Sequence, residues 1–151
     1  VFKETGWMPD IWVIADAGFT SYATTIEVMQ ATIDEDPEAV KCFVEGSAIG
    51  WATYLYGDPT AANALIQADN PDMPDDKIAY SIETMKTYGI VDSGGALEMG
   101  IGAMEEAKIT DFYEKMVAAG VTPAGLDYMS AFDFTWANSG VALPVKAALT
   151  E

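Results

Sequence analysis

A carboxylate and two aromatic rings follow the first apolar run of the chain, in the stretch DIWVIADAGFTSYATTI from Asp10 to Ile26. Asp16 ends the apolar run, and Phe19, Ser21 and Tyr22 follow within six positions. A carboxylate accepts hydrogen bonds from an amino group or a ring N–H, and aromatic rings offer faces for stacking. These residue types indicate a binding site for a small organic molecule. The same spacing also fits a turn aspartate with two rings packed into the core, and the residues alone leave both interpretations open.

Other combinations of residues point away from catalysis, metal binding and cofactors. The chain contains no histidine, so the usual general base and the commonest metal ligand are missing. The lone Cys42 lies on a predicted helix, where we expect a buried structural thiol. The glycines of Val91–Gly102 match neither a Walker loop nor a dinucleotide fingerprint, and they predict a connecting loop. We therefore expect no catalytic residue, no metal ligand and no cofactor.

Two groups of acidic residues, at positions 34–36 and at positions 72, 75 and 76, have the composition of a cation site. Each group lies at the start of a predicted helix, where a carboxylate can cap free amides and interact favourably with the helix dipole. The spacing of a calcium-binding loop is absent from both. We assign these acids to helix starts.

Two strands and four helices are predicted to position the candidate residues. Ile11–Ala15 is apolar on both alternating faces, as in a strand covered on both sides, and Thr24–Met29 is rich in β-branched residues. Apolar spacing, Asp and Pro at the starts and Gly at the ends predict helices over residues 37–56, 59–68, 74–88 and 105–119. The segment 142–151 is predicted to be peripheral.

The helix over residues 37–56 has the clearest apolar face. Its members are Val40, Phe43, Val44, Ser47, Ala48, Trp51 and Leu55. Burial of each large apolar side chain on this face contributes about 1.5–3 kcal/mol. We expect this helix to form the core.

The charge of the chain excludes several classes of partner. Seven basic residues stand against 24 acidic ones, which gives a net charge of −17. This field repels nucleic acids and anionic lipid surfaces. We therefore expect neither nucleic acid nor a membrane surface as a partner.

Three stretches carry a resemblance to a known family: ADAGFTSYATTI, DEDPEAVKCFVEGSAIGWATYLYGDPTAANALIQADNPDMPDDKIAYSIETMKTYGIVDSG and GIGAMEEAKITDFYEKMVAAGV. In content and order they resemble the C-terminal half of the substrate-binding proteins of ABC transporters. Within that family they most resemble the group associated with thiamine-pyrimidine precursors, sulfonates, nitrate and riboflavin. It spans roughly residues 11–140.

The resemblance implies an α/β fold, namely the helix-rich C-terminal portion of a two-lobed periplasmic-binding-protein fold. Residues 1–23 are expected to end the second lobe with a crossover strand, and residues 24–151 to form the helix-rich part of the first lobe. In that family the ligand lies between lobes that close by a hinge motion. The implied ligand-binding residues are Asp16, facing the cleft, together with Phe19, Ser21 and Tyr22, the last two at the hinge.

The function implied is that of a non-enzymatic solute-binding component of an ABC importer, in the periplasm or another extracytoplasmic space. Its partners are a small organic nutrient, such as a thiamine pyrimidine precursor, and the transporter permease. Two strands followed only by helices make an unbalanced sheet, so we expect the other strands upstream of Val1 or in a second copy. The alternatives are an enzyme similar to pyrimidine-precursor synthases and a helical interaction module without a small ligand.

Overall fold

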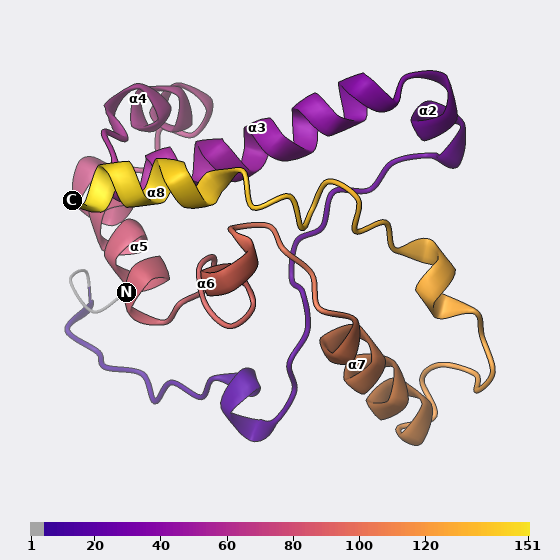
Figure 1. Cartoon of the computed structure of the whole chain (residues 1–151). Coiled ribbons are helices and arrows are strands. Elements are labelled where there is room, and N and C mark those ends of the chain that lie inside the picture. Colours follow the sequence, from indigo (N-terminus) through magenta and orange to yellow (C-terminus); the bar gives the residue numbers. More distant parts are fainter. Residues whose placement is uncertain (1–4) are drawn as a thin grey trace. The chain divides into compact units, whose positions relative to one another are not determined.

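The computed structural model describes residues 5–151, and the regular structure in this range is entirely helical (Figure 1). The α-helices are α2 (Gln30–Glu35), α3 (Pro37–Tyr56), α4 (Thr60–Asp69), α5 (Asp75–Thr87), α6 (Ala96–Met99), α7 (Glu106–Ala118) and α8 (Ala142–Thr150). Two single turns of 3-10 helix, η1 (Ile14–Ala17) and η2 (Tyr128–Ala131), complete the regular structure. No strand occurs between residues 5 and 151.

The predicted α/β class, and with it the two-lobed periplasmic-binding-protein fold, is therefore wrong. The first predicted strand is unpaired at residues 11–13 and then tightens into η1, and the second is irregular up to the start of α2. A strand exists only where a neighbouring strand takes its N–H and C=O groups, and the described chain offers none. The side chain of Trp12, in the middle of the first segment, is accordingly 90% exposed.

The four predicted helices are confirmed. The bounds of α3 agree with the prediction, and those of α4, α5 and α7 agree to within one residue at each end. Helices α2, α6 and α8 were not predicted; α6 lies within the glycine-rich segment that was expected to be a loop.

The start and the end of α3 show why local signals were sufficient there. The amide of Ala39 donates a hydrogen bond to the Asp36 carboxylate at 3.0 Å, and Pro37 occupies the first helical position. At the other end the amide of Gly57 donates to the carbonyl of Thr53 at 2.8 Å. A Cβ atom on Gly57 would lie only 2.8 Å from that same carbonyl oxygen, so this close approach requires glycine.

The described chain divides into two compact units. The first combines the chain up to Thr25 with Glu106–Met129 and contains η1 and α7. The second combines Ile26–Glu105 with Ser130–Glu151 and contains the other α-helices. The domain boundary predicted at residue 23 stays a prediction.

The core of the second unit lies on two sides of α3. One cluster joins α3 to α8 through Ala48, Ala52, Ile101 and Ala142, and Figure 1 shows these two helices side by side. The other cluster joins α3 to α5 through Leu55, Ile78 and Ile82. The alanines have small side chains, which let the two helix backbones approach closely. The segment 142–151 is therefore not peripheral, because Ala142 is only 1% exposed.

The predicted core face of α3 is only partly right. Val40, Ala48 and Leu55 are buried, but Phe43 is 64% exposed, and Trp51 and Cys42 are exposed as well. Phe43 precedes Ala48 by five residues, which puts its side chain roughly 140° around the helix. α8 packs against the side of α3 that carries Ala48 and Ala52, so the side that carries Phe43 and Trp51 stays exposed.

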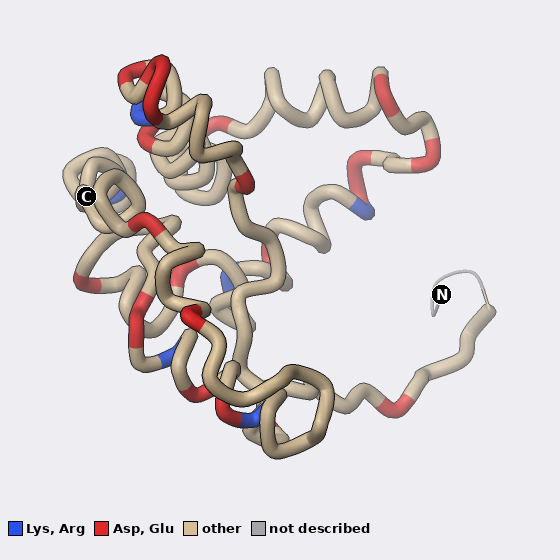
Figure 2. Tube along the Cα trace, turned by 90° about the vertical axis from the view of Figure 1, so that its right-hand side faces the viewer, with Lys and Arg blue, Asp and Glu red and all other residues tan. Residues whose placement is uncertain are grey.

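No helix of residues 5–151 combines the length and the apolar character needed to cross a lipid bilayer. Figure 2 shows acidic positions throughout the traced chain and few basic ones, as the net charge of −17 requires.

Candidate ligand-binding site

One face of α7 holds the turn that contains the predicted site residues. Lys108, Asp111, Phe112 and Lys115 follow the spacing i, i+3, i+4, i+7, which places them along a single side of the helix. All four contact the segment 18–22, about 90 residues earlier in the chain, and both partners belong to the first unit.

Polar contacts fix the backbone of this turn. The Lys115 ammonium donates to the carbonyl of Gly18 at 2.6 Å and pairs with the Asp111 carboxylate at 2.6 Å. The hydroxyl of Thr20 donates to the same carboxylate at 3.4 Å. Lys115 and Asp111 together hold two residues on either side of Phe19, so the turn is anchored at Gly18 and Thr20.

The two predicted aromatic residues also contact α7. The ring of Phe19 packs edge-to-face on Phe112, with 5.4 Å between the ring centroids. The Lys108 ammonium lies 4.2 Å from the centroid of the Tyr22 ring, which is a cation–π contact. One face of Tyr22 is therefore covered by a positive charge and is not available for stacking.

Asp16 and Ser21 are the groups left available. Asp16 lies in η1, is exposed, and has no polar side-chain partner among residues 5–151. Gly18 ends this turn in the left-handed conformation, with φ of 86°. The half-buried hydroxyl of Ser21 likewise has no partner in the described chain.

The structure thus places Phe19 and Tyr22 against α7, with Ser21 between them, and it places Asp16 two residues before the anchored Gly18. The partners on α7 were missed by the sequence reasoning. A usable signal was present, because the chain has only seven basic residues and two of them, Lys108 and Lys115, lie seven positions apart on one helix face. Two lysines on one helix face are unusual in so acidic a chain, and they indicate that this face makes a specific contact.

Chemically, this arrangement offers a carboxylate acceptor, a hydroxyl and an ammonium group beside aromatic rings. Such a set can bind a polar organic molecule that has both hydrogen-bond donors and acceptors. Nowhere in the described range do three Asp, Glu or Cys side chains gather in a way that could hold a metal ion.

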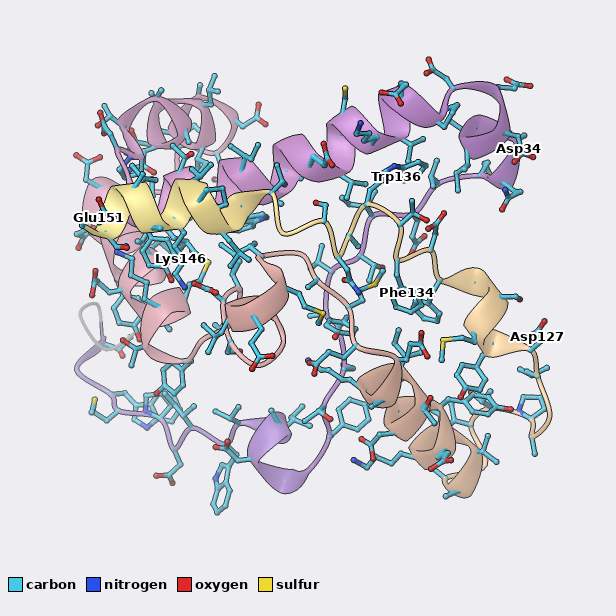
Figure 3. All side chains as sticks on the ribbon, in the orientation of Figure 1. Asp34, Asp127, Phe134, Trp136, Lys146 and Glu151 are labelled. Carbon is cyan, nitrogen blue, oxygen red and sulfur yellow. The ribbon has the colours of Figure 1, made fainter. Side chains whose placement is uncertain are left out.

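A second polar cluster lies in the second unit, around the buried carboxylate of Asp92. Its Oδ2 atom accepts a hydrogen bond from the Tyr56 hydroxyl at 2.5 Å and pairs with the Lys146 ammonium at 2.6 Å. Lys146, labelled on α8 in Figure 3, and Lys86 both lie near the face of the Tyr56 ring, at 5.2 and 5.8 Å from its centroid. The cluster links the end of α3, the loop after α5 and α8, so we assign it to the stability of this unit.

The Tyr56 hydroxyl is expected to make stability depend on pH in alkaline solution. Burial, together with the hydrogen bond to Asp92 and its negative charge, raises the pKa of Tyr56 to about 12 from its usual 10. The folded state therefore keeps a proton that the unfolded state loses, so the stabilisation is complete below pH 10 and is lost as the pH rises towards 12. The ring is only half-buried, so solvent screening limits the change to about 1 kcal/mol.

Urea denaturation of the wild type and of Tyr56→Phe at pH 9 and pH 11.5 measures this difference. The wild type is expected to lose more stability than the variant between the two pH values. Equal losses in the two proteins would contradict the proposed role of the hydroxyl.

Comparison of the chain with protein-family models, with curated protein sequences and with solved structures gave no match. The resemblance to ABC-transporter binding proteins therefore stays a prediction from the sequence.

Proposed function

We propose that this chain binds a small organic solute for an ABC importer, through the turn from Asp16 to Tyr22. The resemblance of the three sequence stretches supports the class of function. One structural observation supports the location: the exposed Asp16 carboxylate, which has no side-chain partner among residues 5–151, lies just before a turn that α7 holds in place through Lys108, Phe112 and Lys115.

An anchored turn is suited to binding because its groups need little further ordering. Ligand affinity is reduced by the cost of immobilising side chains and loops, and a turn already fixed at Gly18 and Thr20 carries less of that cost. The Asp16 carboxylate then accepts hydrogen bonds from an amino or ring N–H group of the solute. Ser21 and the Lys108–Tyr22 pair supply a hydroxyl and a positive charge.

The proposal differs in one respect from the expectation drawn from the sequence. The proposed site is the turn and its supporting helix within the first unit, and it does not depend on a cleft between two lobes. A transporter permease as the macromolecular partner and an extracytoplasmic location belong to the same proposal.

Thermal-shift and calorimetric titrations of the full chain test this function with four probes: an aminopyrimidine, riboflavin, taurine and nitrate. At least one probe is expected to raise the melting temperature in a saturable, concentration-dependent manner. If none of the four stabilises the chain, solute binding of this class is excluded.

Asp16→Asn is expected to weaken binding of the stabilising probe by about 5- to 150-fold, because a charged acceptor is lost from the site (about 1–3 kcal/mol). Asp10→Asn is the matched control, since it makes the same change of charge at an exposed position six residues earlier. Calorimetry on both variants measures the effect. An equal loss in both would mean that only the overall charge matters, and no loss in either would remove Asp16 from the site.

A further inference from the structure

A small apolar pocket lies in the second unit, where an extended segment, α2 and the start of α3 meet. Its volume is about 240 Å³. It is lined by Ile26, Glu27, Val28, Thr32, Ala39, Val40 and Phe43. None of these residues belongs to the proposed solute site, so solute binding does not account for the pocket.

The pocket exists because the two halves of α3 are covered differently. α8 packs against the second half, at Ala48 and Ala52, and leaves the first half to the short α2 and the segment 26–29. Figure 1 shows α3 extending beyond the end of α8 towards α2. The rings and methyl groups of Ile26, Val28 and Phe43 remain exposed as a result.

The size of the pocket selects the kind of occupant. Sites for small organic ligands usually enclose about 300–1,000 Å³, and they carry several converging polar groups. This pocket is smaller, and its lining is apolar apart from Glu27 and Thr32. It matches a single bulky apolar side chain of another polypeptide.

The acidic residues near the pocket favour a polypeptide with basic residues on either side of the apolar side chain. Five acidic residues and one basic residue, Lys41, lie between positions 26 and 43. The acids are Glu27, Asp34, Glu35, Asp36 and Glu38. Glu27 lines the pocket itself, and neither Glu27 nor Glu35 has a side-chain partner in the described chain. Asp34, labelled in Figure 3, lies near the end of α2, three residues before the start of α3.

A second copy of this chain is a poor occupant, because each copy carries a net charge of −17 and would bring further acids to an acidic rim. A segment with basic side chains is attracted by the same rim. Apolar anchors in a pocket with charged groups around them are a common arrangement in protein recognition.

We propose that this pocket docks a segment of a partner protein that carries one bulky apolar residue flanked by lysine or arginine. The apolar side chain enters between Val28, Ala39 and Phe43, and the basic flanks pair with Glu27 and with the acids of the α2–α3 turn. This role goes beyond solute binding and uses different residues.

Three peptides with capped ends serve as probes: Lys-Lys-Trp-Lys-Lys, Lys-Lys-Ala-Lys-Lys and Glu-Glu-Trp-Glu-Glu. Each is titrated into the full, isotopically labelled chain, and amide chemical shifts are followed. The first peptide is expected to shift the amides of residues 26–43 and to bind at least ten times more tightly than the other two. If the alanine peptide binds as tightly as the first peptide, charge alone accounts for the binding. If the acidic peptide binds as tightly, apolar contact alone accounts for it. Either result overturns the proposal.

Ala39→Leu tests the pocket directly, because the larger side chain fills it without changing the charge. Ala39 is exposed on α3 and leucine is a good helix former, so this variant is expected to fold. Binding of the tryptophan peptide is expected to weaken at least tenfold. Ala61→Leu makes the same change at an exposed position in the first turn of α4, and it is expected to leave binding within twofold of the wild type.

Two further results would overturn the proposal. One is unchanged affinity of the tryptophan peptide for Ala39→Leu. The other is sedimentation of the wild-type chain as a dimer that Ala39→Leu converts to a monomer, because the occupant would then be a second copy. In support of the proposal, Glu27→Gln is expected to weaken binding about threefold and to reduce its dependence on salt concentration.

Discussion

Replacing Ile78 with alanine is expected to lower the free energy of unfolding of the second unit by about 2–4 kcal/mol. Ile78 lies on α5, is only 2% exposed, and packs with Leu55 and Ile82. The alanine side chain leaves a cavity where α5 meets α3, so the loss combines the transfer free energy of the deleted carbons with that of the cavity. Among the described residues, Ile78 is the largest side chain that is almost completely buried.

Urea denaturation followed by circular dichroism measures this effect. Ile78→Val is expected to cost about 0.5–1.5 kcal/mol, since only one methylene is lost. Ile90→Ala is the matched control, because Ile90 is 64% exposed and its truncation is expected to change stability by less than about 0.5 kcal/mol. Similar losses for the Ile78→Ala and Ile90→Ala variants would contradict the core that we describe.

The second large effect is expected from Lys146→Met, at about 2–3 kcal/mol of lost stability. The Asp92 side chain is only 4% exposed, and Lys146 supplies its positive partner at 2.6 Å. Without Lys146 a buried carboxylate keeps only the hydrogen bond from Tyr56, and burial of an unpaired charge is strongly unfavourable. The loss is smaller than for a fully enclosed pair because Lys146 is 27% exposed.

Two comparisons separate this effect from a general loss of charge. Lys41→Met removes a lysine from the exposed pair with Glu38, and it is expected to cost less than about 0.5 kcal/mol. The double variant Lys146→Met, Asp92→Asn removes both charges, and it is expected to be more stable than Lys146→Met alone. If the double variant is the less stable of the two, the charge of Asp92 is not the cause.

The parts of the fold that could be predicted are those that depend on neighbouring residues in sequence. The Asp36–Pro37 start and the Gly57 end of α3 are local chemistry, and the structure confirms both. A strand, in contrast, depends on a partner that can lie anywhere in the chain. Apolar, β-branched residues at 11–15 and 24–29 satisfied the local pattern of strands, but no partner strand exists in the described part of the chain.

The same distinction explains the site and the misassigned side chains. Asp16 and Tyr22 were recognised from their residue types, whereas Asp111 and Lys115 contact the turn across more than 90 positions, which spacing cannot reveal. The exposure of Phe43 depends on where α8 packs, and α8 itself was not predicted. α3 carries apolar residues on more than one side, and the helices that pack against it determine which side is buried in the core.

The interleaved path of the chain has a consequence for biosynthesis. The first unit needs residues up to Met129, and the second needs Ala142 to close the cluster on Ala52. Neither unit can therefore be completed from the early part of the chain as it leaves the ribosome. Until α8 emerges, the alanine side of α3 stays open to water and to other nascent chains, so this helix is the segment that a chaperone is expected to cover during synthesis.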